Sequence, residues 1–589
     1  ADRASARTLL HLARRLGDVP IGLVVALRPG EPGAQPEIKE LLAADPRTTA
    51  LVPKPLSEAG SADLVRRWRD DADNELCLRC HSAAEGNPLV VGELARIVSD
   101  AGPDVLADDG SLRGSAHSPV LDREVRRRLA GLERAPRASV EALAILGDGT
   151  TPARLAALAG LELADVSSAR DPLVASGLLA EGDQLAFSHA VIRQAVEASL
   201  SRGERAAGHR QAAALLRRDA APIDAVAAHL LLSDPAGDAS TVATLREAAR
   251  AATDRGAPET ATTYLQRALE EPPAAEEHAA VLVELSTTEF DSGAPGAADH
   301  LRAALPELED HAARIDVLTR LAALEVLQEG GKADSKLFEE EIEAVGAESE
   351  LGLAIELAAL DVLLMIPGRQ RERQARVAEL PAPPPDPGPH HRIAMAHRAW
   401  MAAELGEVPH HEVRRMALEA LEGDALLKAS THRVAFHLAT RALLVSDALP
   451  EAEAVLRRME DDVIRRGSLR MRAAVDWYVA DLHLRAGRIG DAENEARLVL
   501  AFHEDRDAAN CGAVEALVNA LVERGELEEA QAVLREHGWD GPLTEQYREV
   551  GLRLARARLA LALGEAERAL EEALDCGRLR ELQGRPNPA

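Results

Sequence analysis

Apolar residues recur with helical spacing along most of the chain. Residues 3–16 form one amphipathic stripe, and from about residue 203 onward one such segment follows another. The exception is the continuous apolar run 21–27, which is rich in branched residues and bounded by prolines. Such a run predicts a strand buried on both faces of a parallel sheet, and residues 48–52 predict a second short strand. The pattern therefore predicts a mainly α protein that starts with part of an α/β unit.

A repeat with a period of about 39 residues runs through the helical part. In each copy a Gly or Asp ends one predicted helix, and an Ala follows five residues later. A glycine that ends one helix and a small residue where the next helix packs are typical of a helical hairpin. The period is looser than the roughly 34 residues of regular tetratricopeptide repeats. The pairs are Gly256 and Ala261, Gly293 and Ala298, Asp447 and Ala452, Gly487 and Ala492, Gly525 and Ala530, and Gly564 and Ala569.

Residues 150–200 have the outline of a winged helix. Two short helices are predicted, then a hairpin that turns at residues 181–183, then a further helix after His189. The second helix contains Asp165, Asp171 and Pro172, whereas a recognition helix needs basic or amide side chains that face base edges. A regulatory role is therefore predicted for this segment rather than direct contact with DNA.

Composition narrows the functional classes. The chain has 589 residues, enough for several domains, and 46% are hydrophobic but only 2% aromatic. Its formal charge of −30 repels phosphate backbones and argues against nucleic acid as a partner of the chain as a whole. No apolar stretch is long enough to span a membrane. The four cysteines do not suggest a disulfide framework, so a cytoplasmic location is predicted.

Several short motifs resemble haem, zinc or phosphate-binding sites but lack residues that such sites need. Residues 77–81 (Cys-Leu-Arg-Cys-His) match the short haem-attachment string, but they lie in a predicted helix and no second Cys-x-x-Cys completes a zinc site. No phosphate-binding P-loop is present, because Gly331-Lys332 is followed by Ala333 and lacks the earlier glycine. The chain is therefore predicted not to be an enzyme, with no catalytic residues, no bound metal and no tight binding of a cofactor.

Four strings in a fixed order resemble a known family. They are Ala-Asp-Arg-Ala-Ser at the start, Gly-Asn-Pro-Leu at 86–89, Phe-Ser-His at 187–189, and Gly-Ala-Pro-Glu-Thr-Ala at 256–261. Together they resemble the large ATP-binding LuxR-type transcriptional regulators, whose switch module is a signal-transducing (STAND) P-loop ATPase. The resemblance covers residues 1 to about 330, and the remainder matches only as a loose helical repeat. It implies that this chain is a fragment without the Walker A and B half and without the C-terminal helix-turn-helix.

The resemblance also implies roles for four residues. Arg28, at the end of the buried strand, would sense the γ-phosphate. Gly86 and Pro88 would close over the nucleotide, with Pro88 against the adenine. His189 would contact the β-phosphate of ADP. ATP or ADP is therefore the cofactor expected of the full-length parent, a slow switch ATPase.

The resemblance implies partners and a domain order as well. An inducer or partner protein would bind the solenoid, self-association is possible, DNA would be reached only through the missing C-terminal domain, and no membrane is involved. The predicted order is the C-terminal portion of the α/β NTPase domain (1–70), a helical lid (71–132), a winged helix (133–202), the first part of a helical-repeat solenoid (203–380), a Pro-rich linker (381–391) and the second part of the solenoid (392–580).

Two other classes of function remain open at this stage. One is a stand-alone tetratricopeptide-like scaffold for protein interactions, with no nucleotide role. The other is the sensory half of a cyclase or kinase whose catalytic domain is missing. The solenoid is common to all three hypotheses, so it is the part that the sequence predicts independently of the family.

Overall fold

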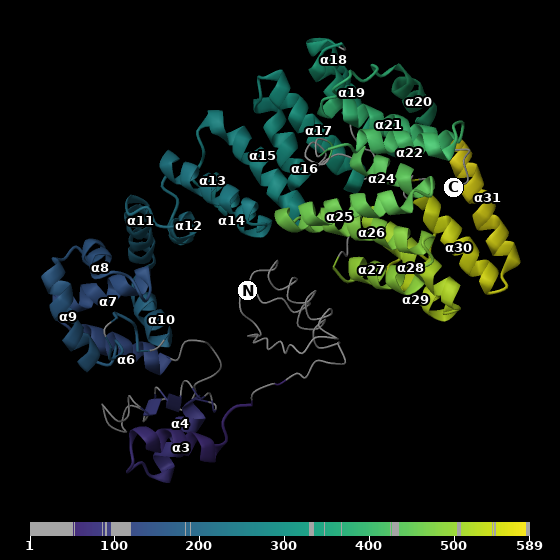
Figure 1. Ribbon diagram of the computed structural model, residues 1–589. Coiled ribbons are helices and arrows are strands. Elements are labelled where there is room, and N and C mark those ends of the chain that lie inside the picture. Colours follow the sequence, from purple (N-terminus) through teal and green to yellow (C-terminus); the bar gives the residue numbers. More distant parts are fainter. Residues whose placement is uncertain are drawn as a thin grey trace. The chain divides into compact units, whose positions relative to one another are not determined.

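The structure is a computed structural model, and its described residues are helical almost throughout (Figure 1). They divide into two compact units, residues 1–248 and residues 249–589. Within the described part, β pairing is limited to one antiparallel bridge between Leu179 and Phe187. The described residues are 51, 54–84, 86, 88, 91–92, 94–95, 119–182, 184–188, 190–328, 335–346, 348–366, 368–423, 426, 435–502, 508–544, 546 and 549–584.

The prediction of a mainly α protein is confirmed. The predicted strand at 21–27 lies outside the described residues, as does the second predicted strand apart from Leu51. The six-part division of the chain is not tested and stays a prediction.

In the first unit, α3 (Glu58–Trp68) and α4 (Asn74–Ala84) pack on each other around Val65, Cys77 and Cys80. The hydroxyl of Ser57 accepts a hydrogen bond from the Gly60 N–H at 3.2 Å. This contact caps α3, because the first N–H groups of a helix have no partner inside it. The pair buries a small core of its own.

A larger core lies among α6 (Pro119–Ala130), α7 (Arg134–Leu146), α8 (Pro152–Ala159), α9 (Leu163–Ala175) and α10 (Ala190–Ser199). Thr151 caps α8, and Pro152 occupies its first turn, where a missing N–H costs nothing. The Ala180 N–H donates to the Ala186 carbonyl at 3.0 Å, and this closes the hairpin between α9 and α10. The order of helices and hairpin predicted for 150–200 is therefore present. α11 (Arg202–Arg218), α12 (Ile223–Leu231) and α13 (Ala239–Asp254) follow.

The second unit is a stack of helices in two layers. Each helix packs on the next, and alternate helices also pack on one another: α17 on α19, α19 on α21, α21 on α24, α26 on α28, and α28 on α30. We call these helices, with α15, the first layer. The helices are α14 (Pro258–Glu270), α15 (Ala275–Ser292), α16 (Ala297–Ala304), the 3-10 helix η3 (Leu305–Glu307), α17 (His311–Gln328), α18 (Ser335–Val345), α19 (Glu350–Met365), α20 (Gln370–Glu379), α21 (Pro389–Leu405), α22 (His410–Ala420), α24 (Ala435–Val445), α25 (Leu449–Arg466), α26 (Leu469–Arg485), α27 (Ile489–Phe502), α28 (Ala508–Arg524), α29 (Leu527–Glu536), α30 (Val550–Ala562) and α31 (Ala566–Leu582).

This packing is that of an α-solenoid of tetratricopeptide-like hairpins, as predicted. Apolar core is continuous from Phe290 on α15 to Leu482 on α26, and a second cluster extends from Ala473 to Leu559. Because the helices of the first layer approach one another more closely than those of the second, the stack curves toward the first layer.

The repeat pattern read from the sequence is present in the structure. Gly487, Gly525 and Gly564 have φ values of 73°, 77° and 82°, which an L side chain adopts only with strain. Ala492 and Ala530, which start the following helices, are completely buried. The glycines therefore end helices, and the alanines lie where paired helices meet.

One long-range contact was not predicted from the sequence. α15 packs on α26, although several hairpins separate them in the stack. The Arg470 guanidinium lies 5.7 Å from the centre of the Phe290 ring, and a Cβ at Gly467 would overlap the backbone of Gly256. Burial raises the pKa of Asp291 to about 6, although Ser468 hydrogen-bonds to it. The curvature of the stack thus brings its early and later helices together.

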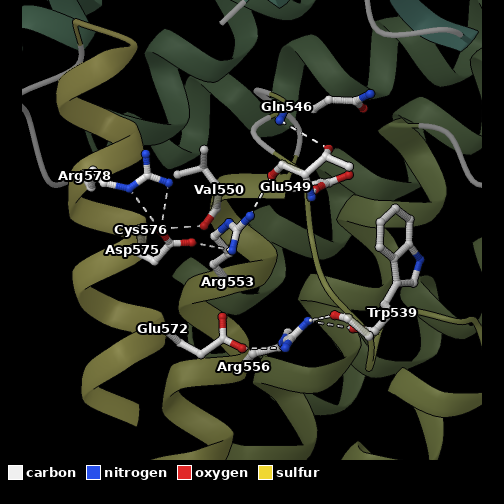
Figure 2. Close-up of polar contacts among 12 residues, drawn as sticks. Trp539, Gln546, Glu549, Val550, Arg553, Arg556, Glu572, Asp575, Cys576 and Arg578 are labelled. Carbon is white, nitrogen blue, oxygen red and sulfur yellow. Dashed lines mark hydrogen bonds and ion pairs between the residues drawn. The ribbon is translucent and has the colours of Figure 1, made fainter. Parts of the chain in front are cut away.

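The last hairpin is held by two buried arginines of α30 (Figure 2). Arg556 donates to the carbonyls of Trp539 at 3.1 Å and Gly541 at 2.7 Å, and pairs with Glu572 on α31 at 2.5 Å. Arg553 pairs with Asp575 at 2.6 Å and donates to the Thr544 carbonyl at 2.6 Å. Bonds to backbone carbonyls satisfy polar groups that a buried loop would otherwise leave unpaired. The network fastens the segment between α29 and α30 to the final hairpin.

Enlarging a buried alanine tests the register of the repeat. We expect Ala530→Leu to lower the free energy of unfolding by about 1–3 kcal/mol, because extra methylenes overpack the contact between helices. Hydrogen exchange should speed up around residues 487–564 and change little in distant hairpins, since repeats couple mainly to their neighbours. Ala532→Leu, at an exposed position of the same helix, is the matched control. Equal effects of the two substitutions on urea unfolding would show that the register is wrong.

Candidate functional site

Among the predicted site residues, Gly86 has a backbone conformation and surroundings that favour glycine. Its φ is +72°, its carbonyl accepts from the Leu56 N–H at 2.7 Å, and its own N–H donates to the His81 carbonyl at 3.1 Å. A Cβ at this position would lie 2.6 Å from the Leu56 carbonyl oxygen. The turn after α4 therefore needs a residue without a side chain, whether or not a nucleotide binds there.

The other three predicted residues are not brought together by the described structure. Pro88 is exposed in the helical segment after Gly86. Arg28 and His189 lie outside the described residues. A nucleotide site made of these four residues accordingly stays a prediction.

The two cysteines of α4, Cys77 and Cys80, are free thiols buried in the small core of the first unit. Burial raises the pKa of the Cys80 thiol to about 11, and the neighbouring Cys77 adds to this rise. A thiol with so high a pKa is a poor nucleophile and a poor ligand, because both roles need the thiolate. Within the described ranges, no group of three or more His, Cys, Asp or Glu side chains is arranged to hold a metal ion.

The most distinctive polar feature of the second unit lies on the first-layer helices. Aromatic and ionisable side chains from α19, α21, α24, α26 and α28 are in contact or close to one another. We call this set the inner cluster. It consists of Asp361, His397, Trp400, His437, Arg441, Trp477, Tyr478, Asp481 and Glu515.

Two buried histidines form the first part of the inner cluster. The His397 Nε2 atom lies 3.2 Å from the Asp361 carboxylate, and both side chains are almost completely buried. The His437 ring lies 5.2 Å from the Tyr478 ring. Burial, with help from the Arg441 charge, lowers the pKa of His437 to about 4, so this imidazole is neutral at physiological pH.

Three tryptophan and arginine side chains form the middle of the cluster. The Arg441 guanidinium carbon lies 5.1 Å from the centre of the Trp400 ring and 5.8 Å from that of Trp477. Trp477 in turn stacks on Tyr478, with ring centres 4.6 Å apart. A cation over an aromatic face contributes about 0.5–2 kcal/mol, more where water is excluded. These contacts fix the position of Arg441 on α24 relative to α26.

Two glycines, Gly512 inside α28 and Gly551 in the first turn of α30, make room for the rest of the cluster. A Cβ at Gly512 on α28 would overlap the Trp477 ring, and a Cβ at Gly551 on α30 would overlap the Glu515 carboxylate. Glycine inside a helix costs about 1 kcal/mol relative to alanine. The positions of Trp477 and Glu515 are therefore specified by the backbones of the neighbouring helices.

Glu515 on α28 is a carboxyl group of the cluster whose pKa is raised. Burial, together with the Asp481 charge, raises the pKa of its carboxyl group to about 7, and the nearby charges of Arg441, Arg485 and Arg558 oppose this rise. Glu515 is half-buried. Among the described residues, none makes a hydrogen bond or ion pair with its carboxylate. A half-buried carboxyl group without a partner is able to accept one from a ligand.

The inner cluster was not predicted from the sequence. Its members come from separate repeats, and no motif links them. Two signals were present: glycines within helical segments at 512 and 551, and three of the few large aromatic residues in a chain with only four Trp and three Tyr. Neither signal points to a site without the neighbouring helices.

Comparisons with known proteins give limited information. No family model matches the chain, and no curated protein matches it. Among solved structures, one match is a STAND protein with a tetratricopeptide repeat sensor from Pyrococcus horikoshii, at 12% identity over 90% of this chain and 72% of that chain, with a TM-score of 0.32.

Two further matches each cover somewhat more than half of this chain. One is a Rap protein complexed with competence and sporulation factor, at 16% identity over 58% of this chain and 88% of that chain, with a TM-score of 0.30. The other is a tetratricopeptide repeat protein from Parabacteroides merdae, at 15% identity over 59% of this chain and 99% of that chain, with a TM-score of 0.18. These scores are too low to carry an argument, so the fold rests on the helix packing described above. No helix in the described part is both long and apolar enough to cross a membrane.

The raised pKa of Glu515 makes a prediction about stability. A carboxyl group whose pKa is about 7 in the folded state and about 4.5 in the unfolded chain favours folding below pH 4.5 and loses this contribution as the pH rises to 7. At pH 8 we expect the free energy of unfolding of Glu515→Gln, measured by urea titration, to exceed that of the parent by about 1–3 kcal/mol. At pH 5 the two proteins should differ little. Glu523→Gln, at an exposed position of the same helix, should leave the profile unchanged. Parallel profiles for Glu515→Gln and the parent would contradict this ionisation.

Proposed function

We propose that this chain is the regulatory and sensor portion of an ATP-dependent transcriptional regulator of the large LuxR type. In this proposal the first-layer helices of the solenoid carry the surface that binds an inducer. The observation that supports a sensor is the inner cluster, where the half-buried Glu515 carboxyl and the half-buried Trp477 ring both lie near Arg441. A scaffold that only stacks helices gains nothing from an unpaired carboxyl or from helix-interior glycines.

The nucleotide switch of this proposal rests on the family resemblance. Residues 150–200 would act as a regulatory winged helix, and ADP would hold a closed monomer until ATP replaces it. Two structural facts are compatible with this. Pro88 is exposed and free to face a ligand, and Gly86 presents its turn beside α3. A cytoplasmic location and DNA binding through a further domain belong to the same proposal.

The sensor role can be tested without knowing the inducer. The probe is the protein-free small-molecule fraction of an extract from the source cells, and the measurement is native mass spectrometry with hydrogen exchange. We expect a mass adduct on the parent chain and slower exchange in α24, α26 and α28, because a ligand orders the helices that it contacts. Both effects should be lost in Glu515→Gln and kept in Glu523→Gln. If parent and Glu515→Gln respond alike, or neither responds, the scaffold hypothesis is favoured.

The nucleotide role is tested in a longer protein that carries the coding sequence upstream of residue 1. We expect Pro88→Ala to weaken binding of fluorescent ADP by removing an adenine contact. Arg28→Ala should reduce the discrimination between ATP and ADP, and His189→Ala should speed the release of ADP. Gly92→Ala, in open space on the neighbouring helical segment, is the control. Parent-like affinities and off-rates in all three variants would refute the roles taken from the family.

A further inference from the structure

The solenoid returns on itself at two places. In the described order of α-helices, α26 comes ten helices after α15 and packs on it. α31 likewise comes ten helices after α20, and beyond its end the Gly584 carbonyl accepts a hydrogen bond from the Gln374 side chain of α20 at 2.7 Å (Figure 1). The same spacing in two separate contacts indicates that one superhelical turn takes about five hairpins. The contact of α15 with α26 is thus where one turn closes.

We call the contact of α15 with α26 the latch. Its members are Gly256, Phe290, Asp291, Gly467, Ser468 and Arg470. Two backbones touch in it, since a Cβ at Gly256 would lie 2.8 Å from the Arg465 carbonyl oxygen and a Cβ at Gly467 would overlap the Gly256 carbonyl. α15 contacts α26 over fewer residues than it contacts α14 or α16. The latch is therefore a small contact, which can part while the hairpins on either side stay packed.

The latch buries a carboxyl group. Asp291 lies in the last turn of α15 and is only 3% exposed, and its Oδ1 atom has no hydrogen bond. Ser468, whose hydroxyl caps the N-terminus of α26, hydrogen-bonds to Asp291. The Arg470 guanidinium lies over the Phe290 ring. Closing the latch therefore takes the Asp291 carboxyl out of water and gives it one hydrogen bond in return.

The charged groups around Asp291 do not neutralise it. Arg466 on α25 pairs with Asp462 at 2.8 Å, and Arg320 on α17 pairs with Asp316 at 2.8 Å. Asp462 also adds a like charge. Burial outweighs the hydrogen bond from Ser468 and the attraction of the two arginines, and it raises the pKa of Asp291 to about 6.

We propose that the latch is proton-linked: it holds the turn closed while Asp291 carries a proton, and it loosens when Asp291 is ionised. Once the helices part, water reaches the carboxylate and its pKa returns toward the ordinary value of 3.8. The closed form thus binds the proton more tightly, so its advantage is complete below pH 3.8 and is lost as the pH rises through 6. This device needs neither a ligand at the inner cluster nor a nucleotide.

Spin labels on either side of the latch test the proposal. Asp254→Cys and Ile464→Cys place labels at exposed positions near the two glycines, and the four native cysteines are buried. We expect double electron–electron resonance to give a short distance at pH 5 and a longer one in addition at pH 8. The ratio of open to closed molecules should rise about tenfold over this interval. A distance distribution that is the same at both pH values would overturn the proposal.

Asp291→Asn identifies the titrating group. In the labelled protein this change should leave the ratio of open to closed molecules independent of pH and lower than that of the parent at pH 8. Asp299→Asn, at an exposed position on α16, should keep the pH dependence of the parent. Glu289 pairs with His300 at 2.8 Å nearby, and titration of this pair would persist in Asp291→Asn. A pH dependence that survives in Asp291→Asn therefore overturns the role of Asp291.

Gly467→Ala tests the contact itself. Its methyl group would overlap the Gly256 carbonyl, so we expect the longer distance at pH 5 as well as at pH 8. Gly487→Ala is the matched control, because Gly467 and Gly487 have similar φ values of 65° and 73° but a Cβ at Gly487 meets nothing within 4 Å. It carries the same backbone strain and should keep the short distance at pH 5. A short distance in Gly467→Ala at pH 5 would show that the two backbones do not form the latch.

Discussion

Close approach of helices through small residues is the constraint on which the second unit depends. Ala452, Ala492 and Ala530 have no exposed surface, and they lie where paired helices meet. These alanines belong to second-layer helices, which pack closely on their first-layer neighbours, while the first-layer helices also pack on one another. The difference in spacing between the two layers curves the stack, and this curvature brings α15 to α26. The inner cluster is a consequence of the same geometry, because only adjacent first-layer helices can place side chains from several repeats together.

Two polar networks in this unit differ in how far their hydrogen-bonding groups are paired. At the last hairpin, Arg553 and Arg556 are paired with carboxylates and with backbone carbonyls, and this fastens a loop (Figure 2). In the inner cluster, His437 Nδ1 is buried without a hydrogen bond, and the Glu515 carboxyl group, which is only half-buried, has no hydrogen bond either. Buried polar groups without partners destabilise a protein by about 1–3 kcal/mol each. The network at the last hairpin thus has a structural role. The unpaired groups of the inner cluster are better explained by a ligand that would form hydrogen bonds with them.

Local sequence patterns allowed much of the fold to be predicted. Contacts between distant repeats could not be predicted in this way. Helix ends such as Gly487 and Gly525 and contact positions such as Ala530 follow from spacing within one repeat, and the structure has them where the sequence placed them. Gly86 was singled out from the sequence, and its described contacts are those of a tight turn, so its role in nucleotide binding stays a prediction. The contact of α15 with α26 could not be read from any window of the sequence, because small rotations at each hairpin add up to produce it. The inner cluster was missed for the same reason.

The arrangement also connects the proposed sensor surface with the rest of the stack. The inner cluster takes its members from α19 to α28, and the same helices carry the packing between the α15–α26 contact and the last hairpin. Packed interfaces change between discrete arrangements more readily than they deform continuously. A ligand that drew α24 and α28 together through Arg441 and Glu515 would therefore change the curvature of the stack as a whole. The closure at Gly256 and Gly467 has no room for such a change, because the two backbones already touch. A change in curvature would therefore require a new arrangement of the contact between Gly256 and Gly467.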